Sequence, residues 1–346
     1  MKTLKDIWAK SPVLGSEQGE TILTHTMKVV HTAKTLCQSL PLRKKQRKQL
    51  LKEVILCSAF HDVGKFATGF QSSLRGIKWG KRHEILSFTI AANVSSGISE
   101  EGLFAIATHH KPIDYWDDVF KSFQLPYSES KDWEVIISEL LDNKEFLIQF
   151  LNLLQERLCL TLQIQTFIQF DHNFGLREIW FAKEEQSNRI STDSRLKASL
   201  LRGLLITSDH IASAGVEQLP TIPVLSDYNK IIKRKEFGSK RPYSFQERTT
   251  KSKGTMILKA PTGSGKTAAI LLWASNNQFV NARLFYVLPH TASINAMHQR
   301  LSQIYCQANV GVLHHRNTAY LFNLLENDNP REKEDNAKLI SSLARE

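Results

Sequence analysis

The spacing of apolar residues changes once along this chain, and that change limits the folds it can adopt. From Ile22 to about Ala214, apolar residues recur every three or four positions, which predicts helices throughout. From Thr255 the order becomes a short apolar run, a glycine-rich turn, a helical segment and a second apolar run at residues 284–288. This order is typical of a βαβ unit. The sequence therefore predicts a mainly α helical bundle followed by the beginning of an α/β domain.

The length of 346 residues allows two domains, each with its own core. Residues 216–253 are rich in proline, glycine, serine and lysine, and predict a linker between domains at residues 1–215 and 254–346. No apolar run is long enough for a membrane span, and the N-terminus lacks the apolar core of a signal peptide. We expect a cytoplasmic protein without a membrane partner. The net charge of +11 favours polyanionic partners such as nucleic acids.

An adjacent histidine and aspartate, His61 and Asp62, stand at the end of a predicted apolar helix and are followed by Gly64 and Lys65. Imidazole and carboxylate together suit a divalent transition metal such as manganese, nickel, cobalt or iron. Other predicted helices supply further candidate ligands, which are His25, His83, His109, His110 and Asp209. Any one of these histidines is more often a core residue with a hydrogen-bond partner, but the whole set in this order favours a metal centre.

The order of these residues, with Gly-Lys after the His-Asp pair, resembles the HD nuclease domain of the CRISPR-associated nuclease-helicases of type I interference. The resemblance spans most of residues 1–215 and implies two metals in a helical bundle. One metal would be held by His25, His61, Asp62 and Asp209. The other would be held by His83, His109 and His110, with Asp62 bridging the two. Two metals a few ångströms apart activate a water and neutralise a phosphate, so Asp62 is the main catalytic candidate.

Lys65 is a second catalytic candidate, because a lysine directly after the His-Asp pair can contact the scissile phosphate. An ordinary surface lysine is an equal alternative.

The second motif, APTGSGKT at residues 260–267, lies between a predicted strand and a predicted helix, as a phosphate-binding loop requires. Backbone N–H groups of such a loop surround the phosphates, Lys266 reaches the terminal ones and Thr267 holds Mg²⁺, so ATP with Mg²⁺ is the implied ligand. The loop resembles that of superfamily 2 helicases, although Ala260 replaces the usual first glycine. Residues 241–246 resemble the adenine-reading segment of that family. The candidate nucleotide-binding residues are Gln246, Thr262, Gly263, Ser264, Gly265, Lys266 and Thr267.

A helicase motor also needs an acidic Mg²⁺-binding box and a second lobe whose arginine completes the ATP site. Neither pattern occurs before Glu346. We therefore expect a truncated protein with little or no ATP hydrolysis of its own.

Together these features predict a metal-dependent single-stranded DNA nuclease that the complete protein couples to an ATP-dependent helicase. The resemblance adds an RNA-guided CRISPR surveillance complex as partner and a role in interference against foreign DNA. Two alternatives stay open. The first is an HD phosphohydrolase of small nucleotides, which the phosphate-binding loop argues against. The second is a non-catalytic nucleic-acid or nucleotide-binding module with structural histidines, which metal analysis would distinguish.

Overall fold

The computed structural model describes residues 3–13, 15–94, 97–110, 131–164, 191–216, 228–277 and 283–328. The chain divides into two compact units, Met1–Glu217 and Gln218–Glu346. Among the described residues, no helix combines the length and the apolar character that crossing a membrane requires.

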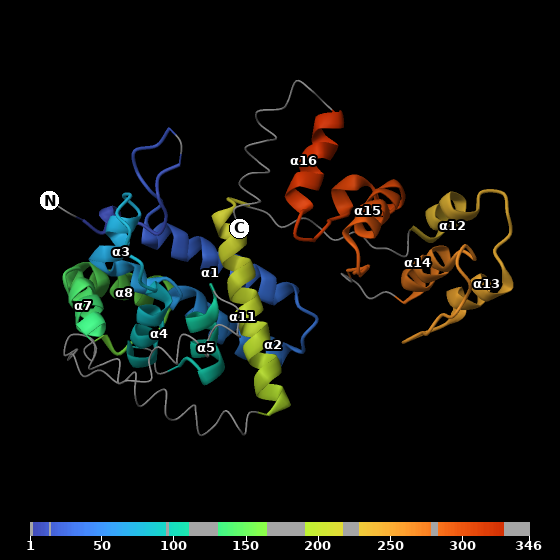
Figure 1. Ribbon diagram of the computed structural model, residues 1–346. Helices are drawn as coiled ribbons and strands as arrows, with labels where there is room; N and C mark the ends of the chain where they lie inside the picture. The colour runs from blue at the N-terminus through green and yellow to red at the C-terminus, as the bar shows by residue number, and fades with distance from the viewer. Residues whose placement is uncertain are drawn as a thin grey trace. The chain divides into compact units, whose positions relative to one another are not determined.

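The first unit is helical in its described part (Figure 1). Its elements are η1 (Leu4–Asp6), α1 (Ile22–Ser39), α2 (Lys44–Phe60), η2 (Val63–Phe66), α3 (Thr68–Ser73), α4 (His83–Val94), α5 (Glu100–Thr108), α7 (Lys131–Leu141), α8 (Lys144–Leu158) and α11 (Thr192–Ser213). The helical bundle expected from the apolar spacing is confirmed.

A single apolar core joins the helices that carry the candidate metal ligands. Its fully buried side chains include Val29 of α1, Phe60 of α2, Leu86 of α4, Ile106 of α5 and Leu205 of α11. Helix α11 packs along α1, α2 and α5, and α4 packs against α5 and η2. Each large apolar side chain contributes about 1.5–3 kcal/mol when fully buried. The core therefore fixes the ends of these helices relative to one another.

Hydroxyl side chains begin three of the helices. Thr21, Ser99 and Ser191 are the N-caps of α1, α5 and α11, and each side-chain oxygen accepts a hydrogen bond from the backbone N–H three residues later, at 3.2, 3.3 and 3.1 Å. Such a cap satisfies an N–H that has no partner inside the helix.

A partly buried polar network ties α2, α5 and α11 together. The Lys197 ammonium of α11 lies 2.9 Å from a carboxylate oxygen of Glu53 and 3.2 Å from one of Glu101. The Ser99 hydroxyl also donates to Glu53, and the Ser194 hydroxyl donates to Glu101. One lysine thus balances two carboxylates from two other helices.

The second unit is helical too in its described part, with a small core of its own. Its elements are α12 (Asn229–Phe237), α13 (Ser244–Lys251), α14 (Lys266–Asn276), α15 (Thr291–Tyr305), η5 (Gln307–Asn309) and α16 (Asn317–Asp328). Its core contains Ile232, Leu271, Leu272, Leu301 and Ile304.

Helices α12 and α13 lie inside residues 216–253, for which the sequence predicts a linker, and both pack against α14. Ile232 of α12 is fully buried, and the Thr249 hydroxyl of α13 donates to the Ala269 carbonyl at 3.0 Å. The described part of this segment is therefore folded onto the second unit.

The two runs predicted as strands, residues 255–259 and 284–288, have no regular secondary structure, and the described part of the chain contains no sheet. Ile257, Phe285 and Val287 are exposed in these runs. A strand is defined by backbone hydrogen bonds to a neighbouring strand. In the described residues the two runs do not form such a pair.

We predict that Lys197→Met lowers the free energy of unfolding by about 1–2 kcal/mol, because it leaves Glu53 and Glu101 without their cation. Burial opposes ionisation of Glu101, but contacts with Ser194 and Lys197 lower its pKa to about 2. The Glu101 contribution is therefore present above the ordinary value of 4.5 and is lost as pH falls from there toward about 2. Urea unfolding between pH 7 and pH 3 measures both effects.

The matched control for this prediction is Lys52→Met, which removes an exposed lysine of α2. If Lys197→Met unfolds like this control over the whole pH range, the network does not stabilise the bundle.

Candidate metal centre

The structure brings together all seven candidate ligands of the helical region. Their positions are His25 within α1, His61 and Asp62 directly after α2, His83 at the start of α4, His109 and His110 directly after α5, and Asp209 within α11. They form two groups in which the ligand atoms lie within 4.8 Å of one another. One group is Asp62, His83, His109 and His110, and the other is His25, His61 and Asp209.

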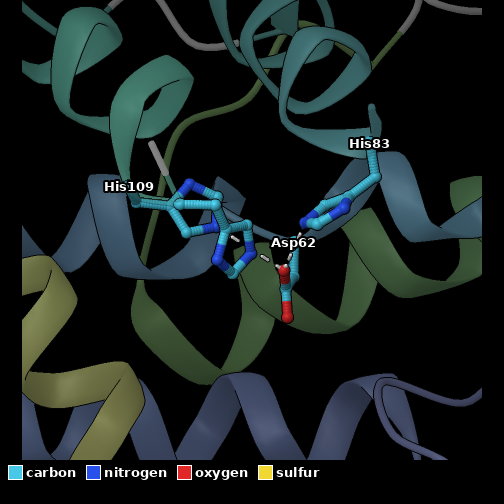
Figure 2. Close-up of side chains that lie close together, drawn as sticks. Asp62, His83 and His109 are labelled. Atoms are coloured by element: carbon cyan, nitrogen blue, oxygen red, sulfur yellow. Dashed lines mark hydrogen bonds and ion pairs between the residues drawn. The ribbon is translucent and has the colours of Figure 1, made fainter. Parts of the chain in front are cut away.

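The Asp62 side chain lies where these two groups meet, and it is 1% exposed. Its Oδ1 atom lies 3.1 Å from Nε2 of His83 and 3.9 Å from Nε2 of His109. Figure 2 shows these two rings approaching the carboxylate from different helices. Its Oδ2 atom lies 3.4 Å from Nε2 of His25 and 3.3 Å from Nε2 of His61. Each carboxylate oxygen of Asp62 therefore faces its own set of imidazoles.

Backbone carbonyls determine which nitrogen of two rings carries hydrogen. Nδ1 of His61 lies 2.8 Å from the Ser58 carbonyl oxygen, and Nδ1 of His109 lies 2.6 Å from that of Ile106. A carbonyl oxygen only accepts hydrogen bonds, so each Nδ1 must be the donor. In the neutral ring Nε2 then carries a lone pair, and that lone pair faces Asp62. A cation between the ring nitrogen and the carboxylate would satisfy both.

Several buried nitrogen atoms of the centre have no hydrogen-bond partner among the described residues. They are both ring nitrogens of His25, Nε2 of His61 and Nε2 of His109, although an Asp209 oxygen lies 3.0 Å from Nε2 of His25. Buried polar atoms without partners are rare, because each loses its hydration without replacement. Imidazole nitrogens and carboxylate oxygens are also the donor set that divalent transition metals prefer. The residues present therefore fit a divalent metal ion.

Two of the histidines, buried His109 and exposed His110, have lowered pKa values. Burial lowers the pKa of His109 well below its ordinary value, and the neighbouring His110 and His61 rings lower it further. His110 is exposed, but partial desolvation of its ring beside the centre, together with the neighbouring His83 ring, lowers its pKa to about 4. Both rings are thus in the metal-binding form at neutral pH.

Opposing effects act on the carboxylate. Burial alone would favour protonated Asp62, but the facing His61 and Lys65 hold its pKa well below the ordinary value. The Lys65 ammonium lies 2.7 Å from Oδ2 of Asp62, donates to the Ala9 carbonyl at 3.2 Å and sits over the Phe70 ring. Lys65 is buried beside the centre rather than exposed at the surface. Its predicted contact with phosphate stays a prediction.

Two residues that the sequence analysis missed lie behind the histidines. Oε2 of Glu20 is 3.4 Å from Nδ1 of His25, and Oε2 of Glu84 is 3.6 Å from Nδ1 of His83. Each carboxylate also pairs with a cation, Lys28 at 2.7 Å and Arg82 at 2.6 Å. A carboxylate behind a ligating histidine orients the ring and raises its basicity. Their short distance in sequence from the predicted ligands was the only available signal.

The structure explains why a glycine, Gly64, stands shortly after the His-Asp pair. A Cβ atom at this position would overlap the carbonyl group of His83, and the Gly64 N–H donates to the Ser87 hydroxyl at 2.9 Å. The missing side chain lets η2 approach the start of α4. That approach places His83 opposite Asp62.

The second unit contains the predicted phosphate-binding loop at the start of α14. Gly263 and Gly265 have positive φ angles of 80° and 83°, a conformation that favours glycine. The Lys266 ammonium donates to the carbonyl oxygens of Ala260 and Pro261, at 2.8 Å each. Thr262 is exposed, while Ser264 and Thr267 are partly buried.

Gln246 contacts this loop from α13. Its side-chain oxygen accepts a hydrogen bond from the Tyr243 N–H at 2.8 Å, and its side-chain nitrogen donates to the Gly265 carbonyl at 3.1 Å. The structure thus brings Gln246 to the loop, in a buried position.

Comparison with known proteins now identifies the family. The sequence profile of the HD domain of Cas3 matches residues 8–215, which contain the whole metal centre and more than half of the chain. The chain belongs to the Cas3 HD family. A second profile, that of the DEAD/DEAH box helicases, matches residues 244–336 and includes the phosphate-binding loop. The recognition of an HD domain followed by the start of a helicase domain is confirmed. No solved structure gave a significant match.

Curated relatives of this Cas3-family chain include the CRISPR-associated nuclease/helicase Cas3 of Methanothermobacter thermautotrophicus, 26% identical over 317 residues. Proteins of Methanocaldococcus jannaschii and Myxococcus xanthus that carry the same name provisionally are each 25% identical, over 304 and 315 residues. These alignments cover 73–80% of this chain and 37–41% of the relatives. The chain thus spans about two fifths of the length of the curated relatives it matches.

Asp62→Ala is predicted to weaken Mn²⁺ binding about 100-fold or more, because it removes the ligand shared by both groups. His110→Ala should weaken the binding of only one of two Mn²⁺ ions, because His110 belongs to only one of the two groups of ligands. Isothermal titration of Mn²⁺ into the metal-free chain measures both variants. Asp193→Ala, which removes an exposed carboxylate of α11, is the control. Two unaltered binding events in Asp62→Ala would exclude this aspartate as a ligand.

Gly64→Ala is predicted to weaken Mn²⁺ binding about 10- to 100-fold although every ligand is retained, because the added methyl group displaces His83. The same titration tests it. Gly203→Ala, at a helical position of α11 where a Cβ atom meets nothing within 4 Å, is the matched control. Wild-type affinity in Gly64→Ala would show that the close approach does not position His83.

Proposed function

We propose that the first unit is a metal-dependent phosphodiesterase that cuts single-stranded DNA. The observation that carries this proposal is the position of Asp62, one buried carboxylate whose two oxygens face two different sets of histidines. This arrangement suits two divalent metals that share a ligand, as in many enzymes that cleave phosphodiesters. A nucleic acid as the substrate is supported by the word nuclease in the names of the relatives and by the net charge of +11.

When bound, manganese, nickel, cobalt or iron ions would supply an activated water and would neutralise the phosphate. The residues of the chain prepare the site for this chemistry. His61 and His109 present Nε2 toward the centre because their Nδ1 atoms bond to backbone carbonyls. Asp62 and Asp209 supply negative charge next to the same ring nitrogens, Nε2 of His25 and Nε2 of His61. Lys65 partly offsets the Asp62 charge and stays a proposed contact to the substrate phosphate.

For the second unit we propose ATP binding with Mg²⁺ at residues 262–267 and Gln246, as part of a helicase in the complete protein. The hydrogen bonds from Lys266 to two carbonyls of its own loop support this, because phosphate oxygens could replace those acceptors. We further propose an RNA-guided CRISPR surveillance complex as partner, supported by the names of the relatives. We also propose the domain limits 1–215 and 254–346, with residues 216–253 between them, although α12 and α13 of this stretch pack against α14.

Cleavage of circular single-stranded DNA tests the nuclease proposal. The purified chain is expected to cut it with Mn²⁺ or Ni²⁺ and without ATP, and Asp62→Ala should lower the rate about 1,000-fold. Lys266→Ala, in the other unit, should cut like the wild type. If the wild-type chain does not cut DNA but hydrolyses cyclic or triphosphate nucleotides, it is a small-nucleotide phosphohydrolase instead.

A further inference from the structure

The segment before α1 runs along the metal centre and is fixed there by backbone hydrogen bonds. Trp8 forms an antiparallel bridge with Thr21. The N–H groups of Ala9 and Lys10 donate to the Glu20 carbonyl at 2.7 and 3.4 Å. Residues 8–10 therefore lie directly beside the start of α1, the helix that carries His25.

A buried glutamine holds the same segment from the other side. The Gln71 side chain accepts a hydrogen bond from the Trp8 N–H at 2.9 Å and donates to the Trp8 carbonyl at 2.8 Å. Lys65 donates to the next carbonyl, that of Ala9. A Cβ atom at Gly19 would overlap both the Lys10 carbonyl and the Trp8 indole, so this glycine permits the close packing. The position of Lys10 is thus determined by contacts on two sides.

The Lys10 side chain is half-buried, and in the described parts of the chain its ammonium group has no hydrogen bond or ion pair. Burial lowers the pKa of Lys10 below its ordinary value and the positive charge of Lys65 lowers it further, while the negative charges of Glu20, Asp209 and Asp62 act in the opposite direction. Lys65 and Lys28 differ from Lys10, since each is paired with a carboxylate at 2.7 Å. The Lys10 N–H bonds to the Glu20 carbonyl, and the carbonyl of the preceding Ala9 accepts from Lys65, which contacts Asp62. The fold therefore places Lys10 beside the centre, and its ammonium has no partner among the described residues.

We propose that Lys10 binds a non-bridging oxygen of the phosphate on which the metal centre acts. The inference rests on the proposed phosphodiesterase function and adds a substrate-binding residue to it. A half-buried ammonium without a partner loses part of its hydration. A charge-assisted hydrogen bond to a phosphate oxygen would compensate for that loss. The Lys65 ammonium is already paired with Asp62. The Lys10 ammonium is not paired in this way and is therefore available to bind the phosphate.

The competing explanation is that Lys10 only balances the carboxylates of the centre from a distance. Direct contact and distant balance have different consequences. Removal of a direct charge-assisted hydrogen bond weakens phosphate binding about 10- to 100-fold. Loss of a distant charge in water-accessible surroundings changes the affinity for phosphate about threefold or less.

The experiment titrates inorganic phosphate into the Mn²⁺-loaded 346-residue chain by calorimetry, for the wild type, Lys10→Gln and Lys10→Met. Both variants are expected to bind phosphate about 10- to 100-fold more weakly, with Mn²⁺ affinity within about threefold of the wild type. Lys5→Gln, an exposed lysine of the same segment, is the control and should match the wild type. Phosphate affinity within about threefold of wild type in both variants, or no phosphate binding by the wild type, overturns the proposal.

Two further titrations, with thymidine monophosphate and with a short oligothymidylate whose linkages are chemically modified to resist cleavage, distinguish a free nucleotide from a strand as the source of the phosphate. Weaker binding of either ligand in Lys10→Gln supports the contact, and unchanged binding of both overturns it. These measurements do not depend on cleavage. A chain that binds phosphate through Lys10 but leaves circular DNA intact would contradict the proposed nuclease and not the role of Lys10.

Discussion

The burial of the Asp62 carboxylate is the constraint on which the rest of the first unit depends. A carboxylate with 1% exposure loses nearly all contact with water, so its charge must be satisfied by the protein or by an ion. Four imidazoles and one ammonium surround it, from α1, α4, the end of α5 and the segment that follows α2. The packing of the bundle can be understood as the means by which these groups reach one carboxylate.

Different kinds of interaction bring each of these groups into place. Apolar packing holds α11 against α1, α2 and α5, and Lys197 links three of these helices through Glu53 and Glu101. A missing side chain at Gly64 sets the distance between η2 and α4. Backbone carbonyls at the ends of α2 and α5 set the orientation of two rings. The geometry of the site therefore depends on features spread over the whole bundle.

The seven candidate ligands could be named from the sequence through their residue chemistry and the resemblance to HD nuclease domains, and the structure brings them together, while their role as metal ligands stays a prediction. The sequence did not reveal Glu20, Glu84 or Lys10, since ordinary charged residues near a predicted ligand carry no signal until the fold shows what they face. The helices at residues 229–237 and 244–251 were missed for a different reason. Their polar, lysine-rich composition is that of a linker, and only the burial of Ile232 and Thr249 against α14 makes them part of a core.

The distribution of the ligands along the chain has a consequence for folding. His25 and Asp209 lie 3.0 Å apart in space but belong to the first and the last helix of the bundle. An ion held by both would act as a cross-link that closes a loop of most of the first unit, and its binding free energy would be added to the free energy of unfolding. The stability of this domain would then depend on the supply of metal.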